Sequence, residues 1–151
     1  MTYSNDIVGS NTKGGRAQTS AIVEFSHQVY SPVDVQEGTV TGSRVHGTAE
    51  VTKEIDTASP SLYQACCTGQ TLDQIVIDFY KITPAGKEEI YYTITMSGVK
   101  VASVTNNVPN TKDPSFEKLN HQERVSFLYE KINWKHADGY EYEDEWAAMP
   151  A

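Results

Sequence analysis

Two adjacent cysteines, Cys66 and Cys67, stand in the stretch SPSLYQACCTG and are the only thiols in the chain. They could serve redox chemistry, metal binding or packing. Neighbouring cysteines rarely bridge each other, because the peptide geometry holds their Cβ atoms apart. A structural zinc site needs about four ligands, usually in spaced pairs, and the sequence contains no C-x-x-C. Buried cysteine behaves as a small hydrophobic side chain, so we expect both thiols to be packing groups.

Other residue types that support catalysis occur without a recognisable spacing. The histidines form no i, i+4 pair and no H-E-x-x-H; they are His27, His46, His121 and His136. There is no G-x-S-x-G, no G-x-G-x-x-G and no P-loop. The acidic runs at 88–89 and 143–145 lack the apolar setting that a catalytic carboxylate needs. The sequence therefore predicts no catalytic residue, no metal site and no cofactor.

The composition is that of a single folded domain, which we place at residues 1–151. The chain is 38% hydrophobic and carries a formal net charge of −8. This charge argues against nucleic acid and against anionic membranes as partners. No stretch approaches the roughly 20 apolar residues of a membrane span. Residues 1–20 lack the apolar core of a signal peptide.

Most of the chain alternates with period two, which indicates strands. In SAIVEFSHQV, one face is predicted to hold Ala21, Val23, Phe25, His27 and Val29. In RVHGTAEVTKEID, residues 44–56, one face is polar throughout: Arg44, His46, Thr48, Glu50, Thr52 and Glu54. This face is either the solvent side of a surface sheet or the wall of a water-filled channel. Residues 30–43, between the two strands, are predicted to form a loop.

The rest of the chain predicts one short helix and further strands. Ser59 as N-cap, Pro60 at the first helical position and Gly69 after the end predict a helix of about nine residues. A strand over 72–82 leads through TPAGKE into a hairpin, and the inward phase is expected to flip at Gly98. Residues 105–121 are expected to form a long loop, and ERVSFLYEKINWKH one long strand that turns at ADG. The sum is an all-β antiparallel barrel or sandwich with one short helix.

Several stretches resemble the haemolysin-coregulated protein (Hcp) family of type VI secretion. TGSRVHGTAEVTKEIDTASPSLYQACCTG carries a T-G-x-R-V-H start and a K-E-I-D entry into S-P-x-L-Y. IDFYKI, GKEEIYYTITMSGVKVASV and RVSFLYEKINWKHADG with the later YEDEW continue in the same register. The resemblance covers about residues 20–146.

The resemblance implies an antiparallel β-barrel with one flanking helix, similar to phage tail tube proteins. It further implies homohexameric rings that stack into the inner tube of a contractile injection machine. The implied partners are a valine–glycine repeat spike protein, a contractile sheath and effector proteins, with no cofactor. The protein would be cytoplasmic before firing and then secreted to the extracellular space or a target cell without a cleaved signal peptide.

Two regions are predicted to serve such an assembly. The polar face that runs from Arg44 to Glu54 is the candidate lumen wall, although the strand SAIVEFSHQV competes for that place. The loop at 30–43 is expected to reach a neighbouring subunit or ring. Its candidate contact residues are Ser31, Asp34, Glu37, Thr39 and Ser43.

The amino terminus departs from the family pattern, because MTYSNDIVGS offers little apolar character beyond Ile7 and Val8. The first strand is therefore expected to be short or displaced, which leaves barrel closure open. With the chain stopping shortly after Trp146, no fused toxin domain is expected. The alternatives are a phage-type tail tube subunit, a monomeric barrel that binds a small molecule between tyrosines, and a small hydrolytic effector.

Overall fold

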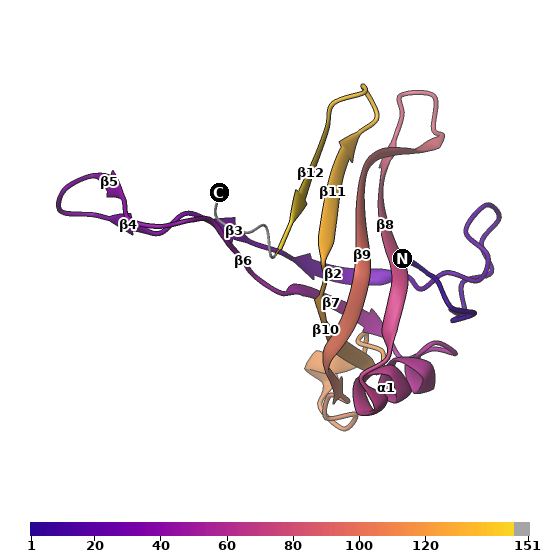
Figure 1. The fold of residues 1–151 in the computed structure, drawn as a ribbon. Helices are drawn as coiled ribbons and strands as arrows, with labels where there is room; N and C mark the ends of the chain where they lie inside the picture. Colours follow the sequence, from indigo (N-terminus) through magenta and orange to yellow (C-terminus); the bar gives the residue numbers. More distant parts are fainter. Residues whose placement is uncertain (147–151) are drawn as a thin grey trace.

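The computed structural model describes residues 1–146, which form antiparallel β-structure with one α-helix (Figure 1). The elements are β1 (Thr2–Tyr3), β2 (Ile22–Ser26), β3 (Val29–Tyr30), β4 (Val33–Asp34), β5 (Thr39–Val40), β6 (Val45–His46), β7 (Ala49–Glu54), α1 (Ser59–Thr68), β8 (Thr71–Ile82), β9 (Glu88–Asn107), a 3-10 turn η1 (Pro114–Phe116), β10 (Gln122–Leu128), β11 (Lys131–His136) and β12 (Glu141–Glu145).

The 20-residue strand β9 organises the main sheet. It pairs with β8 along one side, and with β10 and then β11 along the other. The strand order is β1-β8-β9-β10-β7-β2, and β12 lies outside β11. β10 pairs with one half of β9 and β11 with the other. The strands β7 and β2 continue the sheet from β10, so they pass below the β11–β12 hairpin in the view of Figure 1.

The all-β class is confirmed, and the predicted barrel does not close within residues 1–146. Within residues 1–146, β2 pairs only with β7, and β1 covers only Ile75 and Val76 of β8. The physical cause is the short first strand that the sequence suggested: two residues supply too few hydrogen bonds to join β8 to β2. The seam between β2 and β8 stays open in the chain.

The core lies between the inner face of the sheet and helix α1. Val51, Val125 and Phe127 come from adjacent strands and have no exposed surface. Leu62 and Ala65 of α1 pack against this cluster, which explains why a helix of ten residues is stable here.

The helix prediction is confirmed with one correction. Pro60 lies in the first turn and Gly69 ends the helix in the left-handed conformation at φ 67°. Ser59 is not the N-cap, because Ala58 occupies that position without a side-chain hydrogen bond. The Ser59 hydroxyl donates instead to the buried carboxylate of Glu123 at 2.7 Å.

The phase flip in β9 also occurs as expected. Ile94 and Met96 are buried before Gly98, whereas Val99 and Val101 are buried after it. Gly98 has φ +61°, and a Cβ added there would lie 2.6 Å from the carboxyl group of Glu130. The positive φ therefore favours glycine at this position, and a larger residue would also displace the exposed side chain of Glu130.

Three further expectations need correction. The stretch ERVSFLYEKINWKH forms two strands, β10 and β11, because the chain bends at 129–130 to follow β9. The loop after β9 begins only after Asn107. In β2 a register shift between Ile22 and Glu24 reverses the phase, so Ile22 packs on the core while Val23 is 57% exposed.

Candidate functional site

A polar sheet face extends across four strands on the side opposite the core. Register places Glu24 and Ser26 of β2 opposite Thr52 and Glu50 of β7. The same rows continue through β10 and β9, because cross-strand partners share a face. The polar sheet face consists of Glu24, Ser26, Glu50, Thr52, Glu54, Gln122, Arg124, Ser126, Ser103, Thr105 and Asn107.

The predicted lumen residues divide into two groups. Glu50, Thr52 and Glu54 share the polar sheet face, and the Thr52 hydroxyl reaches the Glu24 carboxylate at 3.5 Å. Arg44 is exposed but lies before β6, and Thr48 lies between β6 and β7.

His46 does not continue this face, since only 5% of its surface is exposed. The alternation fails because Gly47 and Thr48 interrupt the strand, so His46 and Ala49 are both buried. The expectation of one uninterrupted polar row from 44 to 54 is therefore wrong at His46.

The sequence reasoning missed the strands that widen the face. Arg124 of β10 stands opposite Thr52 and contributes a cation, and Thr105 of β9 stands opposite Arg124 and contributes a hydroxyl. Their stretches do alternate polar with apolar residues, but the pairing of β7 with β10 and of β10 with β9 is not visible in the sequence.

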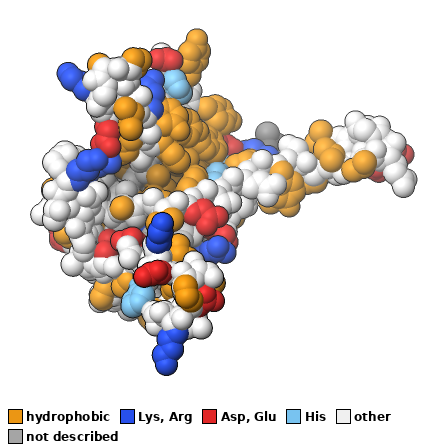
Figure 2. All heavy atoms as spheres, turned by 180° about the vertical axis from the view of Figure 1, so that it is seen from behind, with side chains coloured by type: hydrophobic (Ala, Val, Ile, Leu, Met, Phe, Trp, Pro, Cys, Tyr) orange, Lys and Arg blue, Asp and Glu red, His pale blue; other side chains and the backbone are white. Residues whose placement is uncertain are grey.

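The expected loop at 30–43 is a projecting β-hairpin, which we call the arm (residues 29–46). β3 pairs with β6 and β4 with β5, and the arm extends away from the body (Figure 1). Hydrophobic side chains follow its length (Figure 2). Val33, Val35 and Val40 are 57%, 88% and 65% exposed. Large apolar surface left uncovered on a monomer typically marks an interaction site.

The predicted contact residues all lie within the arm. Ser31, Glu37, Thr39 and Ser43 are exposed. Asp34 is half-buried, and its carboxylate accepts the backbone N–H groups of Gln36 and Glu37 at 2.8 and 3.2 Å. Asp34 therefore shapes the turn at the arm's tip as an Asx turn.

A hydrogen-bonded cluster fixes the root of the arm to the body; we call it the root cluster. The Tyr129 hydroxyl lies 2.6 Å from His27 Nε2 and 2.9 Å from His46 Nδ1. His46 Nε2 lies 3.0 Å from Asp144 Oδ2, and Arg44 donates to the same carboxylate.

Two pKa shifts define the charge state of the root cluster. The hydrogen bonds from Arg44, with further ones from His46 and the backbone, outweigh desolvation and lower the pKa of Asp144 to about 2. Burial raises the pKa of Tyr129, and Asp144 raises it further. At neutral pH the carboxylate is therefore ionised and the phenol is protonated.

A second polar network lies inside the body, beneath α1. Lys53 Nζ lies 2.6 Å from Glu123 Oε1 and 2.7 Å from Asp56 Oδ1, and Lys53 and Glu123 have no exposed surface. Ser59 also donates to Glu123 Oε1, while Glu123 Oε2 has no hydrogen-bond partner among residues 1–146. The sequence reasoning did not include Lys53, because a lysine in an alternating strand is normally exposed.

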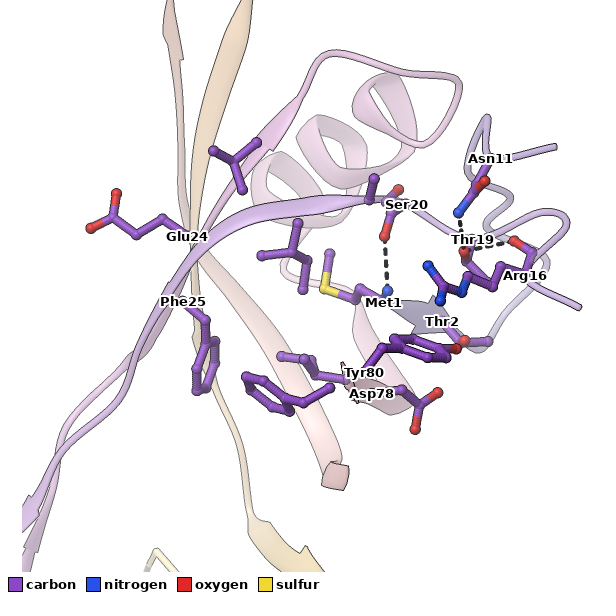
Figure 3. Close-up of a pocket in the computed structure, with 15 residues that line it drawn as sticks. Met1, Thr2, Asn11, Arg16, Thr19, Ser20, Glu24, Phe25, Asp78 and Tyr80 are labelled. Atoms are coloured by element: carbon purple, nitrogen blue, oxygen red, sulfur yellow. Dashed lines mark hydrogen bonds between the residues drawn. The ribbon is translucent and has the colours of Figure 1, made fainter. Parts of the chain in front are cut away.

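A cavity of about 360 Å³ lies at the open seam between β2 and β8 (Figure 3). Met1 projects into it, and the Met1 ammonium donates to the Ser20 carbonyl at 2.8 Å. Arg16 stacks on the ring of Tyr80, with Cζ 3.5 Å from the ring centroid. Since Met1 lines this space and also packs on the core, the cavity lies at the seam between β2 and β8 and not inside a closed barrel.

The expectation that both cysteines are packing groups is correct only for Cys66. Both thiols are free; Cys66 packs partly against the core, whereas Cys67 is exposed. Across residues 1–146 no three histidine, cysteine or carboxylate side chains are close enough together to hold a metal ion. The helix in this described part is too short and too polar to cross a membrane.

Comparisons with known proteins agree with the all-β reading. Residues 1–136 match the family model described as "Type VI secretion system effector, Hcp". The "Major exported protein" of Pseudomonas aeruginosa is 34% identical over 150 residues, which cover 99% of this chain and 87% of that protein.

Solved structures show the same architecture. A variant of the Hcp1 protein from E. coli EAEC 042 has a TM-score of 0.84 at 36% identity, with 95% of each chain covered. The secreted protein Hcp3 from Pseudomonas aeruginosa has a TM-score of 0.74 at 27% identity, covering 91% of this chain and 82% of that one.

Proposed function

Since the chain belongs to the Hcp family of secreted type VI secretion proteins, we propose that it is a structural subunit of the inner secretion tube. It forms hexameric rings that stack and carry effectors during contractile secretion. The family is one of exported tube proteins rather than enzymes. The proposal also includes a cytoplasmic stage before firing, with the spike protein, the sheath and effectors as partners.

The observation that carries this proposal is the polar sheet face. One face of four paired strands is polar while the reverse face forms the core, which suits the solvent side of a sheet and equally the wall of a water-filled channel. A channel wall needs such a face, because folded or extended cargo must slide past without lasting apolar contacts. Three glutamates, one arginine and several hydroxyls and amides provide a wet surface of mixed charge.

The width of this face sets the size of the opening in the proposed ring of six. Neighbouring strands lie about 4.8 Å apart, so four strands span about 19 Å. Six such panels would give a perimeter of about 115 Å and a backbone-to-backbone diameter of about 37 Å. Side chains narrow this opening, yet it still admits an extended chain or a small domain.

The open edges and the arm support association into rings and stacks. The outer edge of β2 carries unpaired backbone groups within the described chain, and such edges are normally protected in monomers. A head-to-tail contact that uses different surfaces on each copy closes into a ring when its rotation divides a full turn. The exposed valines of the arm would be covered by a neighbouring subunit or ring.

Negative-stain images and a mass measurement of the purified chain test this proposal. Rings with a central hole and a mass of six subunits are the expected result. A stable monomer at high concentration with a small molecule in the seam would support the binding-barrel alternative and refute the tube.

The lumen assignment has its own test at Thr52, which lies in the middle of the polar sheet face and is better placed than Thr48. Thr52→Trp should leave rings intact but reduce the amount of effector that copurifies with them. Thr111→Trp makes the same change at an exposed position in the loop before η1, away from the polar sheet face and the arm, and is the matched control. Loss of rings in Thr52→Trp would show that this side chain lies in a subunit contact.

A further inference from the structure

A histidine lies on each side of the arm's root, one just before β3 and one in β6, and the two imidazoles meet at one phenol. His27 precedes β3 by two residues, and His46 belongs to β6, where it pairs with Val29. Their ring nitrogens lie 2.6 and 2.9 Å from the hydroxyl of Tyr129, which belongs to the body between β10 and β11. The orientation of the arm therefore depends on this shared contact.

The charge state of Asp144 decides where each proton sits. The ionised carboxylate accepts, so His46 must carry its proton on Nε2, and its Nδ1 becomes an acceptor. The Tyr129 hydroxyl then donates to His46 Nδ1, and its oxygen accepts from His27 Nε2–H. The three hydrogen bonds therefore all point the same way, from His27 to Tyr129, from Tyr129 to His46 and from His46 to Asp144.

The surroundings of His27 disfavour its protonated form. A second proton on this ring would put a positive charge in a half-buried site beside the rings of Phe25, Tyr129 and Trp134. Burial of a charge among apolar and aromatic groups costs free energy that the neutral imidazole does not pay.

The surroundings of the two histidines offer little to offset an added positive charge. The ring of His46 lies near those of Trp134 and Trp146, with centroids 6.5 and 5.8 Å away. His27 lies 6.0 Å from Trp134 and 6.5 Å from Phe25. The charged groups that contact the root cluster are Asp144 from β12 and Arg44 from the arm, and they already neutralise each other.

We propose that the root cluster is an acid-sensitive hinge, which fixes the root of the arm to the body when His27 is neutral and releases the root when His27 is protonated. The inference rests on the proposed function only for its consequence, namely that acid loosens contacts between subunits. The hinge itself is a property of the single chain.

The direction of the pH dependence follows from proton uptake. Burial lowers the pKa of His27, and the nearby His46 lowers it further. A lowered histidine pKa means that the docked arm binds fewer protons than the released arm. Docking is therefore complete above the ordinary imidazole pKa of about 6.5 and weakens as the pH falls below it.

The hinge is tested by measuring the arm's position in the full chain at low concentration, before any rings form. Spin labels on cysteines at Val35 and Lys87, in a background with Cys66→Ala and Cys67→Ala, report the distance from the arm to the β8–β9 turn by pulsed EPR. One narrow distance is expected at pH 7.5. Below about pH 6.5 a second, broad population should appear, and its ratio to the first should grow about tenfold per pH unit for each proton taken up.

Matched variants assign this change to the root cluster. His27→Gln keeps a donor for Tyr129 but does not titrate, so the broad population should appear only at lower pH. His121→Gln, an exposed histidine outside the root cluster, should behave like the parent. If His27→Gln loosens the arm at every pH, a second measurement on the parent chain replaces this variant. Protonated histidine quenches neighbouring indoles, so the fluorescence of the two tryptophans should fall as the pH is lowered. Its midpoint should equal that of the distance change.

Three results would overturn the hinge: a parent distance that does not change with pH, an unaltered pH profile in His27→Gln, or loss of circular dichroism over the same range. If the arm moves as expected in a chain that never forms rings, the hinge stands and the tube proposal fails. If rings form but the arm does not move, the tube proposal stands and the hinge fails.

Discussion

Replacing Lys53 by methionine should destabilise the fold strongly, because it leaves Glu123 as a fully buried and uncompensated carboxylate. The ammonium lies 2.6 Å from Glu123 Oε1, and it also contacts Asp56 and the carbonyl of Glu54. Methionine fills nearly the same volume, so the loss reports the charge rather than the packing.

The magnitude follows from the burial of the pair. Removing one partner of a buried ion pair costs about 3–5 kcal/mol. A domain of this size has a total free energy of unfolding of about 5–15 kcal/mol, so the fold should survive at reduced stability. With an m-value of about 2 kcal/mol/M, the urea midpoint should fall by about 2 M. The thermal midpoint should fall by about 10 °C.

The double variant Lys53→Met, Glu123→Leu separates the charge from other causes. With both charges removed, stability should return to within about 2 kcal/mol of the parent. Part of the remaining loss comes from the Ser59 hydroxyl. It no longer has Glu123 as its hydrogen-bond acceptor, which costs about 1 kcal/mol of stability. Lys131→Met, at an exposed ion pair with Glu143, is the control and should leave the urea midpoint unchanged.

Urea denaturation followed by circular dichroism at fixed protein concentration measures all four proteins. A loss below about 1 kcal/mol in Lys53→Met would mean that water reaches the carboxylate and that the pair is not isolated from solvent. A double variant as unstable as the single one would mean that packing around Lys53, and not the charge, accounts for the loss.

Three further outcomes are expected. Gly98→Ala should cost about 1–2 kcal/mol in urea denaturation, because φ is +61°. Gly86→Ala, also at positive φ but with open space around it, is its control, and an equal loss would exclude any effect of the Glu130 contact. Deleting residues 36–41 at the arm's tip should leave the thermal transition nearly unchanged but impair assembly; global unfolding would make the arm part of the core. Since the pKa of Asp144 is lowered to about 2, it contributes stability above about pH 4 that is lost as the pH falls toward 2. In Asp144→Asn, the free energy of unfolding should therefore fall less than in the parent as the pH is lowered from about 4 toward 2. An equally steep fall in both proteins would contradict this reasoning.

Local patterns in the sequence determined the elements that depend on neighbouring residues. Pro60 and Gly69 set the two ends of α1, because one starts a helix readily and the other adopts the left-handed end. The turn TPAGKE joins β8 to β9 as predicted, with Gly86 at φ 76°. The phase change at Gly98 was readable because apolar residues alternate on either side of it. The family, too, followed from motifs in the chain, and the family model confirms it.

The tertiary structure decided everything that depends on which strand lies beside which. A period-two pattern gives alternation but not its phase, and a single bulge or break reverses the faces. This is why Val23 is exposed and His46 is buried, against expectation. Lys53 is buried because Glu123, 70 positions along the chain, stands opposite it in β10. The polar sheet face and the root cluster likewise consist of residues from distant strands, so only the pairing of those strands brings their side chains together.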